Sequence, residues 1–426
     1  MSKPYVTLLG KAVRYITRLR GGGSALPGLF VEKIDPNFIK RTLSQLPHGV
    51  VVISGTNGKT TTTKMVVELL QSQGFRVFTN RTGSNFTRGV AAALLGEVDN
   101  KGNLDADIAV LELDEAHAVA FVKSVPPKYS LLLNVMRDQL DRFGEIDTTA
   151  KMLAVIAKST TDAVVLNRED PRVSAIAKIL THQKVSYFGL SPELSHLFPN
   201  DDEMRDRPTQ AKNRVQSVQA DVVLKSLKDD VAQFTLDNKM ITTKLRLQGI
   251  YNIYNAAAAL ALTKVIAENK LDEQKLTDTL AEITPAFGRG ETVTIGGQPL
   301  ELVLVKNPSG FRLSLSSFSP DGYATMIAIN DNYADGRDMS WLWDVEFDSL
   351  KKGGVAEVSG VRAYDMALRL QYDEVLISHV EPNLSAALRE FITANAETPK
   401  RIFCTYTAML ALRRELSKMT NVEVIS

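Results

Sequence analysis

Short runs of apolar, largely β-branched residues alternate with segments of helical length along the first part of the chain. The pattern predicts strands at 50–53, 76–79, 108–113, 129–133 and 163–166. Helices are predicted over 60–73 and, in an alanine-rich segment, over 254–266. Strands that lack a polar face and are separated by helices are typical of parallel βαβ units whose sheet is covered on both sides. We therefore expect an α/β fold.

The rest of the chain has two irregular regions and a second set of strands. Residues 190–217 are polar without a sustained period and predict an exposed insertion, whereas 219–247 alternate weakly, as short antiparallel strands do. Beyond the segment 292–300, a smaller, Rossmann-like α/β sheet is indicated by apolar runs at 324–329, 374–378 and 401–404. We expect an N-terminal helix and loop, a central domain with a parallel sheet and a C-terminal domain, at 1–48, 49–295 and 296–426.

Residues 3–20 carry apolar positions at helical spacing. The apolar and the basic positions of this segment are Val6, Leu9, Val13, Ile16 and Leu19, and Lys3, Lys11, Arg14, Arg18 and Arg20. Two interpretations fit this pattern: a helix docked on its own domain with its charges in water, or a basic helix near an anionic membrane surface. The following segment GGGSALPG, 21–28, is typical of a loop.

Composition narrows the class of protein. The length of 426 residues suits two or three domains. Charge is balanced, with 50 Lys+Arg against 49 Asp+Glu, which argues against a whole-chain nucleic-acid binder or an acidic disordered protein. The single cysteine, Cys404, excludes an intramolecular disulfide and a cysteine-based zinc site but leaves a catalytic thiol open. Because no apolar stretch approaches the ~18 residues that span a bilayer, and no export signal is evident, we expect a cytoplasmic protein.

The loop after the first predicted strand has the residue types of a phosphate site. It reads SGTNGKTTT, 54–62, and leads from a strand into a helix, so its backbone N–H groups and the positive helix end point at one place. Gly55 and Gly58 permit close approach of the backbone. Lys59 can reach the β- and γ-phosphates, and the Thr60 hydroxyl suits Mg²⁺. The alternative is a glycine turn with a surface lysine.

The short form GTNGKTT, 55–61, resembles the phosphate loop of the Mur ligases and folylpolyglutamate synthases. Those enzymes use ATP to convert a carboxylate into an acyl phosphate, which an amine then attacks. The resemblance implies a Mur ligase-like central ATPase domain that uses ATP and Mg²⁺, with Lys59 as a catalytic residue. The loop residues that it places at ATP are Gly55, Thr56, Asn57, Gly58, Lys59, Thr60 and Thr61.

An acid at the end of the third predicted strand has the position of a metal ligand. Glu112 lies at the carboxyl end of that strand, beside the phosphate loop, where a carboxylate suits Mg²⁺. It resembles the family's metal-binding glutamate, which implies Thr60 and Glu112 as Mg²⁺ ligands and a catalytic role for Glu112. The neighbouring Asp114 and Glu115 suit the N-terminal cap of the next helix.

Three further segments resemble motifs of these ligases. NVMRDQLD, 134–141, matches Asn-x-x-x-Asp-His-x-Asp except that Gln139 replaces a histidine that binds metal in many relatives, so a second metal site stays open. Asn252 and Asn255 match Gly-x-x-Asn-x-x-Asn, and such amides suit an adenine edge, although N-capping is the alternative. Arg289 matches Gly-Arg-x-Glu, whose arginine meets ATP because its fork is planar and always charged; a surface turn is the alternative.

The C-terminal third resembles the MurT family rather than Mur ligases at large, and that resemblance extends along essentially the whole chain. The segment KNPSGF, 306–311, stands where peptide-adding ligases carry Asp-Tyr-Ala-His-Asn-Pro, which implies Asn307 at the ATP site. The segment 329–344 is dense in carboxylates. In this family the aspartate matching Asp338 is proposed to complete a Cys–His pair in the partner subunit, and an aspartate that orients a histidine is physically reasonable. The alternative is a structural loop whose acids cap backbone groups.

The resemblance implies a heterodimer with a GatD-like glutamine amidotransferase subunit, which releases ammonia from glutamine. The chain would use ATP to activate the α-carboxylate of D-glutamate in lipid II and form D-isoglutamine. Lipid II lies at the inner face of the membrane, so a peripheral encounter is expected, and no nucleic acid is. Many members carry a four-cysteine zinc ribbon, but 190–230 lacks cysteine and we expect no zinc. An amino-acid ligase of Mur or folylpolyglutamate type and a non-catalytic nucleotide-binding scaffold remain as alternatives.

Overall fold

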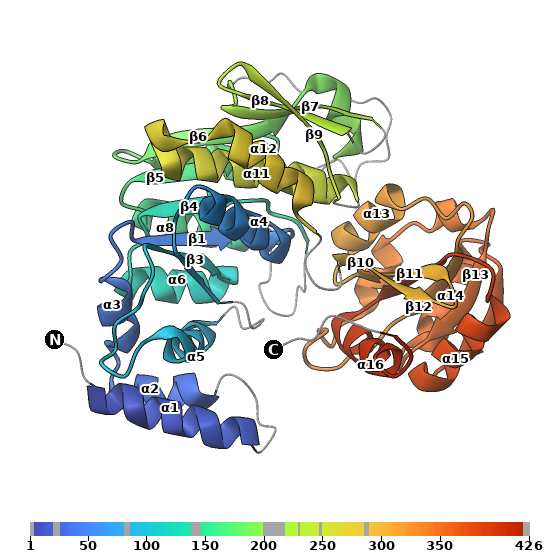
Figure 1. Ribbon diagram of the computed structural model, residues 1–426. Helices are drawn as coiled ribbons and strands as arrows, with labels where there is room; N and C mark the ends of the chain where they lie inside the picture. The colour runs from blue at the N-terminus through green and yellow to red at the C-terminus, as the bar shows by residue number, and fades with distance from the viewer. Residues whose placement is uncertain are drawn as a thin grey trace.

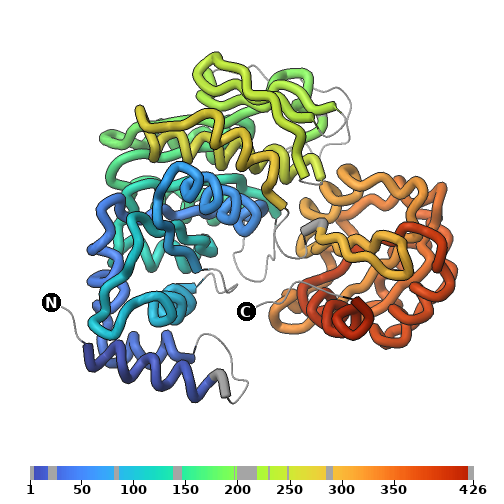
Figure 2. Tube along the Cα trace, viewed as in Figure 1, coloured from blue at the N-terminus to red at the C-terminus, as the bar shows by residue number. Residues whose placement is uncertain are grey.

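The structure is a computed structural model that describes residues 4–19, 26–80, 86–137, 146–198, 218–228, 231–246, 249–284 and 289–420. Within these residues the chain forms two α/β units, each built on one sheet (Figures 1 and 2). Parts of several predicted features lie outside the described residues. They include residues 21–25 of the predicted loop 21–28, the motif residues 138–141 with Gln139, residues 199–217 of the polar insertion and residues 285–288 before Arg289.

Nine strands form the central sheet, in the order β2-β3-β1-β4-β5-β6-β7-β8-β9. The strands from β2 to β7 run parallel, whereas β8 and β9 are antiparallel additions at the edge. The parallel sheet predicted from the apolar runs is therefore confirmed. The bounds are β1 Val50–Ser54, β2 Val77–Thr79, β3 Ile108–Glu112, β4 Tyr129–Leu132, β5 Ala163–Asn167, β6 Lys184–Leu190, β7 Val222–Lys228, β8 Val231–Leu236 and β9 Lys239–Lys244.

Both faces of this sheet are buried, because successive strand residues enter different cores. In β1, Val51 and Ile53 pack with α4, α11 and α12, whereas Val50 and Val52 pack with α5, α6 and α8. The alternation explains why the strand has no polar face. The helices and 3₁₀ turns of this unit are α4 Lys59–Ser72, α5 Thr87–Glu97, α6 Glu115–Ser124, α8 Ile146–Ser159, α9 Pro171–Ala175, η1 Ile176–Ile179, η2 Pro192–Leu197, α11 Ile250–Ala267, η3 Glu268–Lys270 and α12 Glu273–Glu282.

Helix α11 is apolar enough to resemble a membrane span. With the turn that follows, residues 250–270 have the length and mean hydropathy of one, and 67% of the apolar window is buried inside the protein. The expectation that no apolar stretch reaches this length was therefore wrong. The reason is local: the alanine-rich helix packs between α4 and the sheet, where small side chains allow close approach.

Three N-terminal helices extend the lower layer in Figure 1: α1 Pro4–Leu19, α2 Leu26–Ile34 and α3 Phe38–Leu43. Residues 26–28 were predicted as a loop but open α2, and that prediction was wrong. Pro27 is tolerated in the first turn of a helix because its missing N–H has no intrahelical partner there. A Cβ at Gly28 would lie 1.9 Å from the carbonyl oxygen of Arg88, so glycine lets α2 approach the backbone of α5.

The second unit contains a six-stranded sheet in the order β10-β11-β15-β12-β13-β14. All neighbours are parallel except β10 and β11. Strand β10 precedes the predicted boundary at 295/296, yet it pairs within this sheet, so the change of sheet falls between 284 and 289. The strands are β10 Arg289–Ile295, β11 Gln298–Leu304, β12 Ala324–Ala328, β13 Val355–Ser359, β14 Ile377–Glu381 and β15 Lys400–Cys404.

Helices cover both faces of the second sheet and complete two further cores. Strand β14 begins three residues later than the predicted run 374–378, because Glu374 has a φ of +58° and forms a turn. The helical elements are α13 Pro308–Ser317, η4 Ser340–Asp344, η5 Asp348–Leu350, α14 Ala363–Tyr372, α15 Leu384–Ala394 and α16 Tyr406–Leu416.

Candidate active site

The phosphate loop joins β1 to α4 at the carboxyl edge of the central sheet, where the strand order turns from β3 to β4. Gly55 and Gly58 have φ values of +136° and +89°, a region that favours glycine. A Cβ at Gly55 would lie 2.9 Å from the backbone nitrogen of Asn134, and one at Gly58 would lie 2.7 Å from Asn255 Oδ1. Both glycines are therefore required by close packing against Asn134 and Asn255 as well as by conformation, whereas their approach to a phosphate stays a prediction.

Asn134 clamps this loop from the end of β4. Its Oδ1 accepts from the backbone N–H of Asn57 at 2.8 Å, and its Nδ2 donates to the Asn57 carbonyl at 3.0 Å. The backbone N–H of Thr56 also donates to the Asn134 carbonyl at 3.0 Å. These three hydrogen bonds fix the backbone of the loop, so its N–H groups are already oriented before a phosphate binds. The motif at 134–141 was predicted from sequence, but this role of its first residue was not.

Lys59 is buried within the loop that it belongs to, with 5% of its surface exposed. Its Nζ donates to the carbonyls of Gly55 and Thr56 and lies 3.6 Å from Glu115 Oε2. Glu115 is 2% exposed and is the first residue of α6. Its side chain was predicted to suit the helix cap, but the structure shows no such cap bond and gives it the role of counter-ion to Lys59.

Two side chains with oxygen atoms that could bind a metal ion, Thr60 and Glu112, meet at the phosphate loop. Thr60 Oγ1 donates to Glu112 Oε1 at 2.9 Å, from the first turn of α4 to the end of β3. Asn80 fixes the backbone of Glu112 with two hydrogen bonds, of 2.8 and 3.0 Å. A hydroxyl and a carboxylate at a helix N-terminus form the hard oxygen set that Mg²⁺ prefers, so these residues fit the metal. Asn80 lies in no motif that the sequence analysis identified, and only the fold places it beside Glu112.

Helix α11 brings the second asparagine of its motif to the loop. Gly249 is the N-cap of this helix and makes no side-chain cap bond, and Asn252 and Asn255 lie inside the helix, which begins at Ile250. The N-capping interpretation of these two residues was wrong. Asn255 contacts Gly58, which places its amide at the phosphate loop. Asn252 lies one turn earlier, with its backbone N–H bonded to the Gly249 carbonyl.

Asn307 links the second unit to the phosphate loop. Its Oδ1 accepts from the backbone N–H of Gly310 and caps α13, and its Nδ2 donates to Asn57 Oδ1 at 3.1 Å. The side chain is 1% exposed. The N-terminus of α13 therefore faces the loop that opens α4, so two positive helix ends converge near Asn57. The structure places Asn307 beside the phosphate loop, and its predicted role toward ATP stays a prediction.

The predicted arginine of the ATP site is only partly described. Arg289 begins β10, and its side chain lies outside the described part of the chain. The glutamate of the same motif, Glu291, forms an ion pair with Arg413 of α16, and both side chains are largely buried. This pair fixes the start of β10 to α16 within the second unit. The role of Arg289 toward ATP stays a prediction.

The acidic segment after β12 separates into a buried and an exposed carboxylate. Asp335 is 4% exposed and accepts from the backbone N–H and the hydroxyl of Thr407, and burial raises its pKa. Asp338 is exposed and accepts from the backbone N–H of Ser340 at 2.9 Å, and hydrogen bonding with Ser340 lowers its pKa. Asp338 is thus an ionised group at the surface of the second unit, apart from the residues that meet at the phosphate loop.

Cys404 is not a catalytic thiol. It is fully buried in an apolar core at the end of β15, and this burial raises the pKa of its thiol. A nucleophilic cysteine needs exposure and a lowered pKa. The thiol role left open by the sequence was therefore wrong.

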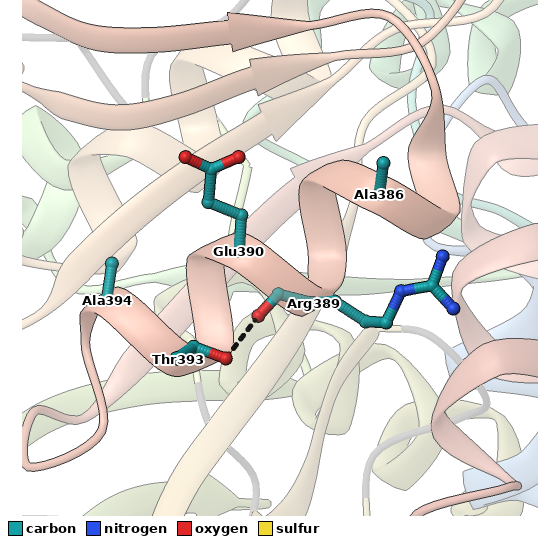
Figure 3. A pocket seen from close by; sticks show the side chains of 5 residues that line it. All are labelled: Ala386, Arg389, Glu390, Thr393 and Ala394. Carbon is teal, nitrogen blue, oxygen red and sulfur yellow. Dashed lines mark hydrogen bonds between the residues drawn. The ribbon is translucent and has the colours of Figure 1, made fainter.

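A hollow on the outer surface of the second unit lies along a single helix, α15. It has a volume of about 500 Å³ and is lined by Ala386, Arg389, Glu390, Thr393 and Ala394 (Figure 3). Beside it, His379 Nδ1 lies 3.1 Å from Glu357 Oε2 and 3.6 Å from Glu390 Oε2. None of the predicted site residues lines this hollow.

Comparison with known proteins agrees with this geometry. Residues 53–263 match the Mur ligase middle domain and residues 304–409 match the MurT ligase C-terminal domain. The MurT subunit of lipid II isoglutaminyl synthase (glutamine-hydrolysing) from Streptococcus pneumoniae is 30% identical, over 96% of this chain and 96% of that protein. The same-named subunit from Staphylococcus aureus strain COL is 31% identical, over 86% and 87%.

The fold is also that of solved Mur ligases. MurF from Thermotoga maritima in complex with ADP superposes with a TM-score of 0.65, at 17% identity, covering 90% of this chain and 84% of that one. The MurT relatives and the Mur ligase fold together show that this chain is an ATP-dependent ligase. With identity of 30% over nearly its full length, the chain belongs to the MurT family of Mur ligase-like, ATP-dependent ligases.

Proposed function

We propose that this chain amidates the α-carboxylate of D-glutamate in lipid II, through an acyl phosphate, with ammonia from a GatD-like glutaminase subunit. One observation carries the proposal: a phosphate loop with a buried lysine, beside the paired side chains of Thr60 and Glu112, lies in a chain that matches a MurT subunit over 96% of its length. The word subunit in the names of those relatives supports a partner protein.

The first half-reaction would take place at the phosphate loop. A carboxylate oxygen of the substrate attacks the γ-phosphorus of ATP, the bond to the β-phosphate oxygen breaks, and ADP leaves. The loop N–H groups bind the phosphates, and the Lys59 ammonium offsets the charge that builds on the transferred group. Thr60 and Glu112 would hold Mg²⁺, which when bound would neutralise phosphate charge. Asn307 holds the second unit against Asn57, which helps to exclude water.

The second half-reaction needs only a nitrogen nucleophile. Ammonia attacks the acyl carbon, the carbon–oxygen bond to phosphate breaks, and loss of a proton leaves the amide. The acyl phosphate would hydrolyse in water, so closure of the second unit over the loop favours amidation. The contact between Asn307 and Asn57 is a described element of such closure.

Asp338 suits the proposed role in the partner's active site. It is exposed, it is held ionised by hydrogen bonding with Ser340, and η4 follows it directly. Apolar surface surrounds this turn: Trp343 is 49% exposed and packs edge-on against Tyr372, which is 76% exposed. Large aromatic residues at a surface are typical of protein interfaces. We therefore assign this face to the glutaminase subunit.

The decisive experiment compares ammonium salts and glutamine as nitrogen donors. The purified chain with its amidotransferase subunit is incubated with ATP, Mg²⁺ and lipid II, and the product is identified by mass spectrometry. Lys59→Ala should abolish amidation with either donor, whereas Lys64→Ala, on the partly exposed side of the same helix, should retain it. Amidation that survives Lys59→Ala would contradict the ATP-site assignment. Consumption of an added amino acid in place of ammonia would favour an amino-acid ligase.

A further inference from the structure

Helix α1 has an apolar face that its own domain does not cover. It packs on α2 and α5 through Val6, Gly10 and Thr17, at the outer end of the central unit (Figure 1). The opposite side exposes five large apolar or aromatic side chains by 48 to 67%, namely Tyr5, Leu8, Leu9, Tyr15 and Ile16. The interpretation of a docked helix thus explains only one side of α1.

The exposed side chains form one continuous stripe. At 100° per residue, they fall within an arc of about 120° on the helix, and this arc lies opposite the side that Val6, Gly10 and Thr17 bury. Ala12, also exposed, lies at its centre. No charged residue among these positions interrupts the stripe. A surface helix normally turns polar residues to water, so an uninterrupted apolar stripe indicates a second binding partner.

Charge distribution indicates which partner. The whole chain is nearly neutral, with 50 Lys+Arg and 49 Asp+Glu, yet residues 1–31 contain five basic and no acidic residues. Of the basic residues whose side chains are described, Lys11 lies on the flank between the buried side and the stripe, where it is partly exposed. Arg14 lies on the buried side, where its guanidinium packs against Gly96 of α5. An apolar stripe on a segment rich in basic residues is the pattern of helices that lie in the interface of anionic membranes.

We propose that α1 docks the protein on an anionic lipid surface, with the defined stripe of Tyr5, Leu8, Leu9, Tyr15 and Ile16 inserted at the level of the headgroups. This proposal rests on the proposed function, because a substrate that is anchored in a bilayer must be reached at the membrane surface. Tyrosine side chains suit this depth, since the ring is apolar and the hydroxyl stays hydrated. Attraction of basic residues adds an ionic contribution that salt screens.

The test is flotation of the full chain, with its partner subunit, on vesicles of phosphatidylcholine alone or with phosphatidylglycerol. We expect binding to the anionic vesicles that weakens roughly tenfold or more in Leu8→Glu/Ile16→Glu, because both the lost apolar burial and the added charge oppose insertion. Ile179→Glu, which replaces a 43% exposed isoleucine on η1, is the matched control and should bind as the parent does.

Three outcomes overturn the proposal: no binding to anionic vesicles, binding unchanged by the double substitution, or dissociation of a dimer or of the partner subunit by that substitution in light scattering. The last would show that the stripe is a protein interface. Amidation of detergent-dispersed lipid II separates this failure from that of the proposed function. If the protein does not bind vesicles but amidates dispersed lipid II, only the docking proposal is wrong. If the protein binds anionic vesicles but amidates no lipid II, the proposed function is wrong.

Discussion

The buried pair of Lys59 and Glu115 makes a prediction that separates folding from catalysis. Replacing Glu115 with glutamine keeps the shape of the side chain but removes its charge. The two charges lie 3.6 Å apart with exposed fractions of 6% and 2%. At an effective dielectric constant of about 20, their attraction is roughly 4–5 kcal/mol. Desolvation offsets part of this value.

We expect Glu115→Gln to lower the free energy of unfolding by about 2–3 kcal/mol. This lies below the ~3–5 kcal/mol for breaking a buried pair, because the amide oxygen still faces the ammonium and Lys59 keeps its two carbonyl acceptors. For a unit of this size the melting temperature should fall by roughly 5–10 °C. The control, Glu97→Gln, changes an exposed glutamate at the end of α5 and should leave the melting temperature within about 1 °C.

Saturating ATP supplies the test of mechanism. Phosphates near Lys59 replace the missing negative charge, so ATP should stabilise Glu115→Gln more than it stabilises the parent, and the difference in melting temperature should shrink. The measurement is thermal unfolding by circular dichroism, with and without ATP and Mg²⁺. Equal stability of the variant and parent without nucleotide would refute the ion pair. A difference that ATP leaves unchanged would refute the position of phosphate beside Lys59.

Three further changes test other parts of the structure. Gly28→Ala should destabilise the protein by about 1–3 kcal/mol in urea denaturation, because the added Cβ would lie 1.9 Å from the Arg88 carbonyl oxygen. Asp338→Asn should abolish amidation with glutamine but retain it with ammonium salts, and loss of both would contradict an effect confined to the partner. The hydrogen bond with Glu357 raises the pKa of His379 above 6.5. The stabilisation that the protonated imidazole gains from Glu357 is therefore complete below about pH 6.5 and is lost as the pH rises through the raised pKa. In melting temperatures measured across this pH range, His379→Gln should flatten the dependence on pH.

The sequence predicted the parallel sheet and the phosphate loop because both depend on local patterns. Apolar runs without a polar face are typical of strands covered on both sides, and β1 has this environment. Strand β6, at 184–190, was not predicted, since its first residues are partly exposed and it resembles a loop locally. Likewise β10 was assigned to the wrong side of the boundary, because only its pairing with β11 shows which sheet it joins.

The sequence predicted the phosphate loop of the candidate site, but not which side chains pair with the loop residues. Three acids, Glu112, Asp114 and Glu115, follow one another within four positions, and their order does not say which faces metal and which faces lysine. Glu112, the last residue of β3, contacts Thr60, whereas Glu115, the first residue of α6, lies beside Lys59. A buried acid needs a partner, and this requirement becomes visible only when burial is known.

The second sheet places Asn307, which contacts the phosphate loop, and the acidic segment with Asp338 along one edge. The ends of β11, β15 and β12 are level, because Cys404 pairs with both Leu304 and Ala328. Asn307 follows β11 and the acidic segment follows β12. Thr407, in the first turn of α16 after β15, donates two hydrogen bonds to Asp335. Asp335 is 4% exposed, so the two hydrogen bonds from Thr407 satisfy a carboxylate that water does not reach. A partner subunit docked at Asp338, as proposed, would therefore contact the same edge of the sheet that reaches the phosphate loop through Asn307 and Asn57.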